Sequence, residues 1–240
     1  MTGAGDTGNR DDLRESPESR ADLVSKLTHE VRGPVSTLRG LVGTTLAHYD
    51  RLSDDERREF LHLIKHEADR LERSVEQAAL ALKLDAGSLR FDIRSQDLGA
   101  IVREAAQAAE TGDHPVDVEV AEAIEAAVDG AQVATVVRQL IDNAVTFSPP
   151  ESPITISLRR DGDHALIEVT DRGPGVPPDK REAVFERFAD WRPPDYEDRP
   201  GAGLGLFISR TVARAHGGDA SIADGPAGGT MLVVRLPMEG

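Results

Sequence analysis

Residues 61–82 carry an unbroken alternation of apolar positions that lie three and four residues apart over three heptads. The positions are Leu61, Ile64, Ala68, Leu71, Val75, Ala78 and Leu82. A stripe with this period occupies one face of an α-helix and is typical of a helical bundle or a coiled-coil seam. The pattern therefore predicts a long amphipathic helix that buries one face against other helices.

A second helical pattern precedes this one. Its apolar positions are Leu23, Leu27, Val31, Val35, Leu38 and Val42. A turn is expected at residues 49–52, and Ser53 with Glu56 matches a capping box at the start of the next helix. Two such helices joined by a short turn form an antiparallel hairpin. One hairpin has little core of its own, so we expect pairing with a second copy rather than packing on the rest of the chain.

From about residue 97 the pattern changes to a mixture of helices and strands. Helix-like runs lie near 98–105, 131–146 and 203–216, and strand-like runs lie at 116–120, 154–159, 165–170 and 231–236. The order lacks regular β-α-β alternation, which favours an α+β sandwich with helices on one face of a mixed β-sheet. The expected organisation is a disordered tail at 1–20, a hairpin at 21–84, a connector at 85–96 and a second domain at 97–240.

Charge and composition exclude several classes of function. The 240 residues carry a formal net charge of −15, which disfavours nucleic acid and anionic lipid as partners. The absence of cysteine excludes disulfides and thiolate metal sites. No apolar run approaches the roughly 18 residues of a membrane span, and no signal peptide is visible. We expect a cytoplasmic protein, or the soluble part of a membrane-bound one.

Three segments point to one nucleotide site: Gly201–Leu206, Asp171–Gly175 and Asn143. Gly205 opens a helix-like run, and the free backbone N–H groups at a helix start bind phosphate. Asp171 ends a strand-like run, and its carboxylate suits an exocyclic amine. Asn143 lies on a helix-like run, and its amide oxygen suits a hard cation. A group that can recognise the adenine base, a ligand for a cation and a backbone site for phosphate together predict that the chain binds Mg-ATP.

His29 is the candidate nucleophile. It lies roughly opposite the centre of the apolar stripe near Leu27, so the imidazole is expected to face solvent. Glu30 follows directly, where it can orient the ring or take its proton. Pro34 removes a helical hydrogen bond one turn later and predicts a kink. Neutral imidazole is a nucleophile at cellular pH, although this helix taken alone would favour an ordinary surface histidine.

These segments resemble the catalytic core of a sensor histidine kinase of a two-component system. The matching boxes are His29–Pro34, Gln139–Ala144, Asp171–Gly175, Val184–Phe188, Gly201–Leu206 and Gly228–Thr230. The resemblance covers about residues 20–237. It implies an all-α helical hairpin that dimerises as a four-helix bundle, followed by an α+β sandwich ATP-binding domain with a mixed β-sheet (the Bergerat fold). It also implies phosphotransfer from ATP through the hairpin histidine to an aspartate of a response regulator receiver domain.

The resemblance also implies a role for each matched residue. His29 would accept the γ-phosphoryl group with Glu30 as base or orienter, and Asn143 would hold Mg²⁺. Asp171 would read adenine. The other expected nucleotide-binding residues are Gly173, Gly175, Gly201, Gly203, Leu204, Gly205 and Thr230. Arg187 would stabilise charge during transfer, with a surface salt bridge as the alternative. Residues 189–202 would form an ATP lid anchored by Phe185 and Phe188, and a separate or removed sensor module would supply the signal.

Three positions depart from the family pattern. Gly33 stands where the family usually has Thr or Asn to position water, so we expect weak phosphatase activity. Thr146 replaces a basic residue that contacts phosphate, and Gln139 replaces Asn. Two other functions fit the sequence less well. An ATPase of the gyrase and MutL type needs a glutamate base where Gln139 stands, and a degenerate dimeric scaffold is disfavoured by the intact Asn143 and Asp171.

Overall fold

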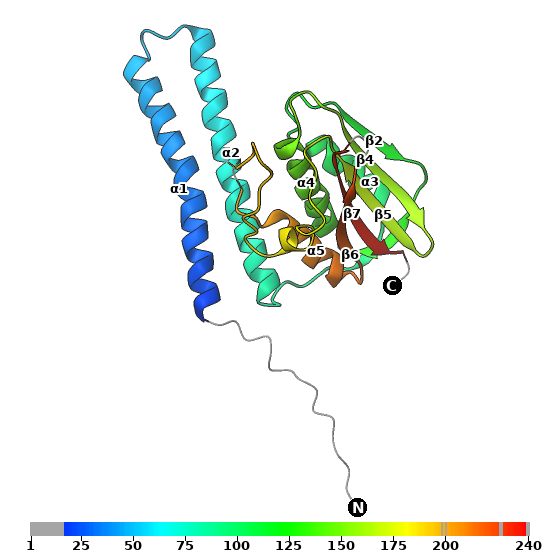
Figure 1. The fold of residues 1–240 in the computed structure, drawn as a ribbon. Coiled ribbons are helices and arrows are strands. Elements are labelled where there is room, and N and C mark those ends of the chain that lie inside the picture. Colours follow the sequence, from blue (N-terminus) through cyan, green and yellow to red (C-terminus); the bar gives the residue numbers. More distant parts are fainter. Residues whose placement is uncertain (1–16, 198, 200, 226–227, 239–240) are drawn as a thin grey trace, which may run out of the picture. The chain divides into compact units, whose positions relative to one another are not determined.

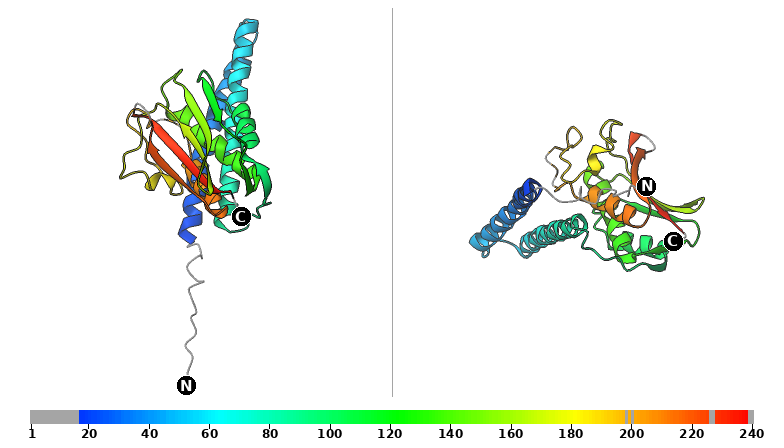
Figure 2. Two further views of the ribbon diagram at one scale, coloured as in Figure 1. Left: turned by 90° about the vertical axis from the view of Figure 1, so that its right-hand side faces the viewer. Right: turned by 90° about the horizontal axis from the view of Figure 1, so that it is seen from below.

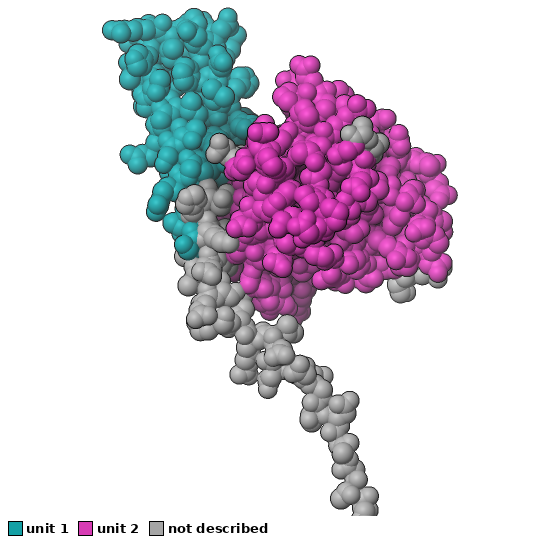
Figure 3. All heavy atoms as spheres, in the orientation of Figure 1, with its two compact units in different colours: residues 1–71 teal, residues 72–240 magenta. Residues whose placement is uncertain are grey.

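The computed structural model describes residues 17–197, 199, 201–225 and 228–238, without the side chains of 17–24, 26, 27, 29 and 30. The chain divides into two compact units, residues 1–71 and residues 72–240 (Figure 3). Each unit is described by itself. The tail expected at residues 1–16 lies outside the described residues.

The first unit contains α1 (Pro17–His48) and the first part of α2 (Asp54–Asp85), joined by a short turn (Figure 1). The expected turn is confirmed, because the Arg51 and Leu52 N–H groups donate to the carbonyl of His48 at 2.8 and 3.1 Å. The capping box is also confirmed. Ser53 N–H donates to Glu56 Oε2 at 2.7 Å, and Glu56 N–H donates to Ser53 Oγ at 3.3 Å.

The tail prediction is wrong for residues 17–20, because α1 already begins at Pro17. Proline is favoured at the first helical position, where its missing N–H would have no intrahelical partner. The helix runs from there through Pro34 to His48. Among the described residues, no helix is long and apolar enough to cross a membrane.

The second unit is built on a five-stranded sheet in the order β2-β4-β5-β7-β6 (Figure 2). The strands are β2 (Val116–Val120), β4 (Ile154–Asp161), β5 (His164–Thr170), β6 (Asp219–Asp224) and β7 (Thr230–Pro237). β2 pairs with β4 in parallel and all other pairs are antiparallel, so the predicted mixed sheet is confirmed. The register sets Ile167 of β5 opposite Leu158 of β4 and Val234 of β7.

Helices cover one face of this sheet: α3 (Leu98–Ala108), α4 (Gly130–Phe147) and α5 (Gly205–Ala215) (Figures 1 and 2). The core lies between the helices and alternate strand residues. Its fully buried side chains include Leu140, Ile141, Ile154, Ile156, Leu158, Ile167, Ile208, Leu232 and Leu236. The period-two pattern of the strands and the 3.6-residue period of the helices place these side chains on facing surfaces. The last turns of α2 also belong to this unit, with Ala78 and Ala81 buried.

Three strands were missed by the sequence patterns. β1 (Arg94–Asp97) and β3 (Glu125–Val128) form a separate antiparallel pair, so the connector expected at 85–96 contains the start of a strand. β6 is an edge strand against β7. Their sequences, RSQD, EAAV and DASIAD, are poor in β-branched and aromatic residues, so long-range pairing sets their conformation rather than local preference.

Candidate functional site

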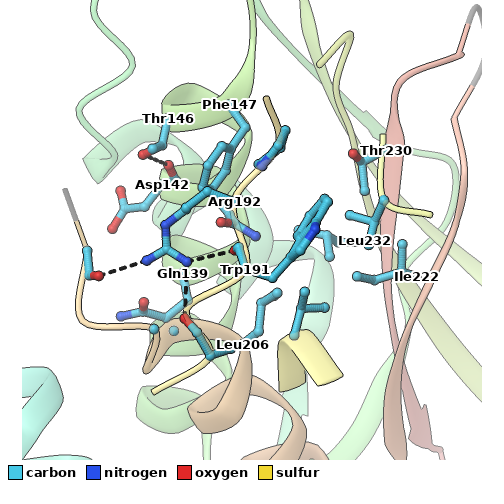
Figure 4. Close-up of a pocket in the computed structure, with 18 of the residues that line it drawn as sticks. Gln139, Asp142, Thr146, Phe147, Trp191, Arg192, Leu206, Ile222, Thr230 and Leu232 are labelled. Carbon is cyan, nitrogen blue, oxygen red and sulfur yellow. Dashed lines mark hydrogen bonds between the residues drawn. The ribbon is translucent and has the colours of Figure 1, made fainter. Parts of the chain in front are cut away.

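A pocket in the second unit brings most of the predicted nucleotide-binding residues together (Figure 4). It holds about 1050 Å³ of empty space, part of it open to solvent. The predicted residues that line it are Asn143, Asp171, Gly175, Gly201, Gly203, Leu204, Gly205 and Thr230. Gly173 is not part of the lining, but its N–H donates to Asp171 Oδ1 at 2.7 Å. Residues far apart in the chain therefore meet at one site.

Asp171 follows the end of β5 and is 3% exposed. Its Oδ1 accepts hydrogen bonds from the backbone N–H groups of Gly173 at 2.7 Å and Thr230 at 3.2 Å. Burial raises the pKa of this carboxyl, and the hydrogen bonds from Gly173 and Thr230 oppose that rise. The carboxyl is thus fixed in the pocket wall, where it suits recognition of a hydrogen-bond donor such as an exocyclic amine.

α4 supplies the polar wall of the pocket. Gln139, Asn143 and Thr146 lie at i, i+4 and i+7, so they share one face of the helix. Thr146 Oγ1 donates back to the carbonyl of Asp142 at 2.7 Å, so its hydroxyl is engaged with its own helix. Burial raises the pKa of Asp142, an effect that the charge of Arg73 opposes. This face carries amide oxygens and one carboxyl but no cation.

The start of α5 faces the pocket through the glycine-rich loop. α5 begins at Gly205, and among the described residues around it no side chain caps the helix at Leu204. Its first backbone N–H groups are therefore open to a ligand. Gly203 has φ +66°, and a Cβ there would lie 2.4 Å from the carbonyl oxygen of Ala189. Gly203 therefore requires glycine, whereas a Cβ at Gly205 would lie 2.7 Å from Gln139 Oε1, the end of a side chain that can turn away.

The segment expected to form the lid contributes Trp191, Arg192 and Pro193 to the lining. Figure 4 shows the indole of Trp191 between Arg192 and the strand residues Thr230 and Leu232. At its start, Phe185 and Phe188 are buried, 5% and 8% exposed, as expected of residues that anchor the lid. Asp198 and Pro200 of this segment lie outside the described residues.

α2 also reaches the pocket, which the sequence did not predict. Gln77 lines it and donates from Nε2 to Gln139 Oε1 at 2.9 Å. Gln77 is a polar neighbour of the apolar stripe, and no local signal distinguishes it from a solvent-facing residue. Arg187, predicted to stabilise charge in transfer, lies outside the lining and forms an ion pair with Asp85 at the end of α2. A salt bridge was the alternative prediction for Arg187, and this structure shows one.

The phosphoacceptor segment lies on α1 in the first unit. His29 and Glu30 are helical, but their side chains lie outside what the structure describes, so their solvent exposure stays a prediction. Gly33 is exposed, and a Cβ added there would meet nothing within 4 Å. Among the described residues, no cluster of three or more His, Asp or Glu side chains is arranged to hold a metal ion.

Two protein families match successive parts of the chain. The His Kinase A (phospho-acceptor) domain matches residues 19–87, which contain the two helices and His29. The histidine kinase-, DNA gyrase B-, and HSP90-like ATPase family matches residues 128–240, which contain nearly the whole pocket. The matched ranges follow the division between the helical region and the mixed-sheet region that the structure describes.

Individual relatives agree with the family matches. The sensor-like histidine kinase SenX3 of Mycobacterium tuberculosis is 30% identical over 233 residues, covering 95% of this chain and 56% of the relative. The sensor protein KdpD of Clostridium acetobutylicum is 27% identical over 228 residues, covering 94% of this chain and 25% of the relative. The chain therefore spans between about a quarter and just over half of these curated relatives.

A solved structure of the mycobacterial sensor histidine kinase MprB is similar with a TM-score of 0.54 and 29% identity, over 61% of this chain and 98% of that one. One family match covers the helical hairpin and the other covers the nucleotide pocket, in the order that kinase cores have. Together these matches support a histidine kinase catalytic core, with a phosphoacceptor helical region followed by an ATPase-like domain.

Proposed function

We propose that the chain is an ATP-dependent protein-histidine kinase that autophosphorylates His29 and passes the phosphoryl group to an aspartate of a response regulator. The observation that carries the proposal is the convergence of Asn143, Asp171 and the glycine loop before α5 in one pocket. Each of these groups matches a different part of a nucleotide. The family matches to residues 19–87 and 128–240 support the same function.

Recognition of adenine is assigned to Asp171. Its carboxyl accepts two backbone hydrogen bonds through Oδ1, which leaves the group rigid and able to accept a further hydrogen bond from the adenine amine. The phosphates are assigned to the uncapped start of α5, where backbone N–H groups and the helix dipole favour negative charge.

Mg²⁺ is assigned to the amide oxygen of Asn143. Magnesium in nucleotide sites is commonly held by one or two protein oxygens together with the substrate phosphates, so a dense carboxylate cluster is not required. Asn143 on α4 and Gly205 at the start of α5 line the same pocket, which fits that pattern. The ion would neutralise negative charge on the phosphates during transfer.

In the transfer step, an imidazole nitrogen of His29 attacks the γ-phosphorus, the new N–P bond forms, and the P–O bond to the ADP leaving group breaks. Glu30 takes the imidazole proton, which keeps the phosphorylated ring neutral. In the second step, a carboxylate oxygen of the receiver aspartate attacks the same phosphorus, the N–P bond breaks, and the imidazole takes its proton back from Glu30. Little covalent chemistry is needed from the protein, since positioning and electrostatics carry phosphoryl transfer.

The chain is proposed to work as a homodimer through its helical hairpin. Leu61, Val75 and Leu82 lie 14 and 7 residues apart on one seven-residue repeat of α2 and are 60%, 52% and 40% exposed. Val42 and Leu46 of α1 are 40% and 72% exposed. Large apolar side chains exposed in a row are typical of a surface that another helix covers. The other proposed partners are a receiver domain and a separate or removed sensor module. The proposed location is the cytoplasm, either as a free protein or as the soluble part of a membrane-bound sensor kinase.

The decisive experiment is incubation with γ-labelled ATP. The wild-type chain should acquire acid-labile label, and His29→Gln should acquire none while still binding ATP. His62→Gln is the matched control, because His62 is an exposed histidine on the other helix and should leave labelling intact. Release of phosphate without labelling would instead support an ATPase of the gyrase type. Neither labelling nor hydrolysis would support a scaffold.

A further inference from the structure

The charge balance of the pocket singles out one residue. Among the described lining residues, Arg192 is the one with a cationic side chain, whereas Asp142 and Asp171 both carry carboxyl groups. A nucleoside triphosphate carries several negative charges, and binding it beside carboxyls requires positive charge nearby. The α4 wall does not provide this positive charge. Thr146 stands where the family pattern has a basic residue, and its hydroxyl donates to the backbone carbonyl of Asp142.

Arg192 is held where the two ends of the lid meet. Its Nη1 donates to the carbonyls of Ala189 at 3.1 Å and Trp191 at 2.9 Å, and its Nη2 donates to the carbonyl of Gly201 at 2.8 Å. Gly201 opens the loop that leads into α5, so the guanidinium lies beside the segment that presents backbone N–H groups. Figure 4 shows its side chain on the α4 side of the pocket, near Gln139 and Asp142.

The guanidinium retains capacity for an anion. Its three bonds to carbonyls use three of the five N–H donors of an arginine. Carbonyl oxygens are neutral, and within the described part of the chain no carboxylate forms an ion pair with Arg192. Arginine binds phosphate through paired N–H groups, and charge-assisted bonds of this kind are stronger than bonds to neutral carbonyls. A phosphate is therefore a better acceptor for this group than the lid carbonyls.

We propose that Arg192 is the residue that binds the terminal phosphates of the nucleotide, so that the pocket binds a triphosphate more tightly than a monophosphate. The three carbonyls hold the side chain in place until a phosphate takes over its donors. The inference rests on the proposed function, since it requires that the pocket binds ATP. It assigns to the lid the positive charge that the α4 wall lacks.

The chain contains a reporter for this step. Trp191 is its single tryptophan, it adjoins Arg192, and it lines the same pocket. Its fluorescence can therefore follow titrations of the whole chain with ATP, ADP and AMP in the presence of Mg²⁺. For Arg192→Met we expect the affinity for ATP to fall roughly 10- to 100-fold, as for loss of a charge-assisted hydrogen bond. The affinity for AMP should change less than about twofold, and Arg192→Lys should recover part of the loss.

Arg199→Met is the matched control. Arg199 belongs to the same segment, is exposed, and lies over the Tyr196 ring at 5.6 Å, so its removal makes the same change in net charge. It should leave ATP affinity within about twofold of wild type. Retained AMP binding by Arg192→Met establishes that the variant is folded.

Two results would overturn the assignment. Equal losses of ATP and AMP affinity in Arg192→Met would mean that Arg192 only holds the lid together, and equal losses in the Arg199 and Arg192 variants would mean a general charge effect. In either case wild-type labelling of His29 would leave the proposed function standing. Failure of the wild-type chain to bind ATP would refute both proposals.

Discussion

Gln77 of α2 donates a hydrogen bond to Gln139 of α4 over 2.9 Å, and both side chains line the nucleotide pocket. The last turns of α2 are thus part of the ATP-binding unit. Arg73 forms an ion pair with Glu110 at 3.0 Å in the same region, and Ala81 is 1% exposed. Because α2 is one continuous helix from Asp54 to Asp85, it belongs to both compact units. Residues near its end are therefore good places to test how the two units cooperate.

The ion pair between Arg187 and Asp85 predicts that Asp85→Asn speeds autophosphorylation. Their side chains are 24% and 21% exposed, so the pair is partly shielded from solvent. The resemblance to the family assigns to Arg187 the stabilisation of charge on the transferred phosphoryl group, and in that role Arg187 would have to leave Asp85. Weakening the competing pair by about 1 kcal/mol should raise the initial rate of His29 labelling about fivefold at saturating ATP.

Glu110→Gln is the matched control for this prediction. It breaks the ion pair of Arg73, which lies on α2 as Asp85 does, and it leaves the ion pair of Arg187 intact. It should leave the labelling rate within about twofold of wild type. If Asp85→Asn labels His29 more slowly and has a lower melting temperature, the ion pair stabilises the fold and does not hold Arg187 away from the phosphoryl group. Arg187 would then lose its assigned role in transfer.

Local signals explain most of what the sequence predicted correctly. The capping box of Ser53 and Glu56 depends on residues three positions apart, and the hydrogen bonds agree with it. The helices follow from a 3.6-residue period and the central strands from a period of two. Asp171 and Gly203 were identified because their segments combine a turn signal with a chemical requirement that few other residues meet.

The features that were missed depend on contacts between distant segments. Arg192 was not assigned a role because its carbonyl partners become neighbours only when the lid folds back on itself. His216 at the end of α5 is a second such residue. Its buried ring accepts a hydrogen bond at Nε2 from Asp129 N–H at 3.0 Å and donates from Nδ1 to the carbonyl of Val212 at 2.8 Å. No local pattern reveals such a link between α5 and the start of α4.

Asp171→Asn should weaken nucleotide binding without lowering the stability of the fold. Asparagine keeps an oxygen for the N–H groups of Gly173 and Thr230, but its NH₂ group opposes the adenine amine instead of accepting from it. We expect the affinity for ATP to fall about 100-fold, equivalent to about 2.7 kcal/mol. The measurement is ATP titration, with Asp117→Asn on the exposed side of β2 as the control for charge.

The same variant carries a pH signature. Burial raises the pKa of Asp171 above its ordinary value of 3.8, so the folded protein holds this proton more tightly than the unfolded chain. Ionisation of Asp171 therefore lowers the free energy of unfolding as pH rises through the raised pKa. Asp171→Asn should melt at or above the wild-type temperature at pH 7, and the difference should vanish as pH falls below 3.8. A lower melting temperature at pH 7 would contradict the burial argument.

Leu61→Glu should convert the dimer into a monomer. A charge on the apolar row of a helical interface is left buried and unpaired, which costs several kcal/mol. In a monomer the same substitution is nearly neutral, because Leu61 is 60% exposed. Light scattering during size-exclusion chromatography gives the mass. Leu63→Glu is the control, since Leu63 is 47% exposed but lies off the seven-residue row. Loss of the dimer in both variants would mean that the row is not the interface.

Gly33→Thr should give the chain a phosphatase activity that the wild type lacks or has only weakly. The resemblance to the family assigns this position to a Thr or Asn that orients water for attack on the phosphorylated regulator, and glycine has no side chain for this. The site accepts the new group without a clash, because a Cβ at Gly33 meets nothing within 4 Å. A helix-interior glycine is also replaced by a better helix former, so stability should not fall. The measurement is hydrolysis of a phosphorylated receiver domain that has accepted its phosphoryl group from His29.

Gly43→Thr is the matched control, because Gly43 is also exposed on α1 with nothing within 4 Å of its Cβ position, and it should leave hydrolysis unchanged. Rapid hydrolysis by the wild-type chain would refute the premise that the side chain at position 33 limits the reaction.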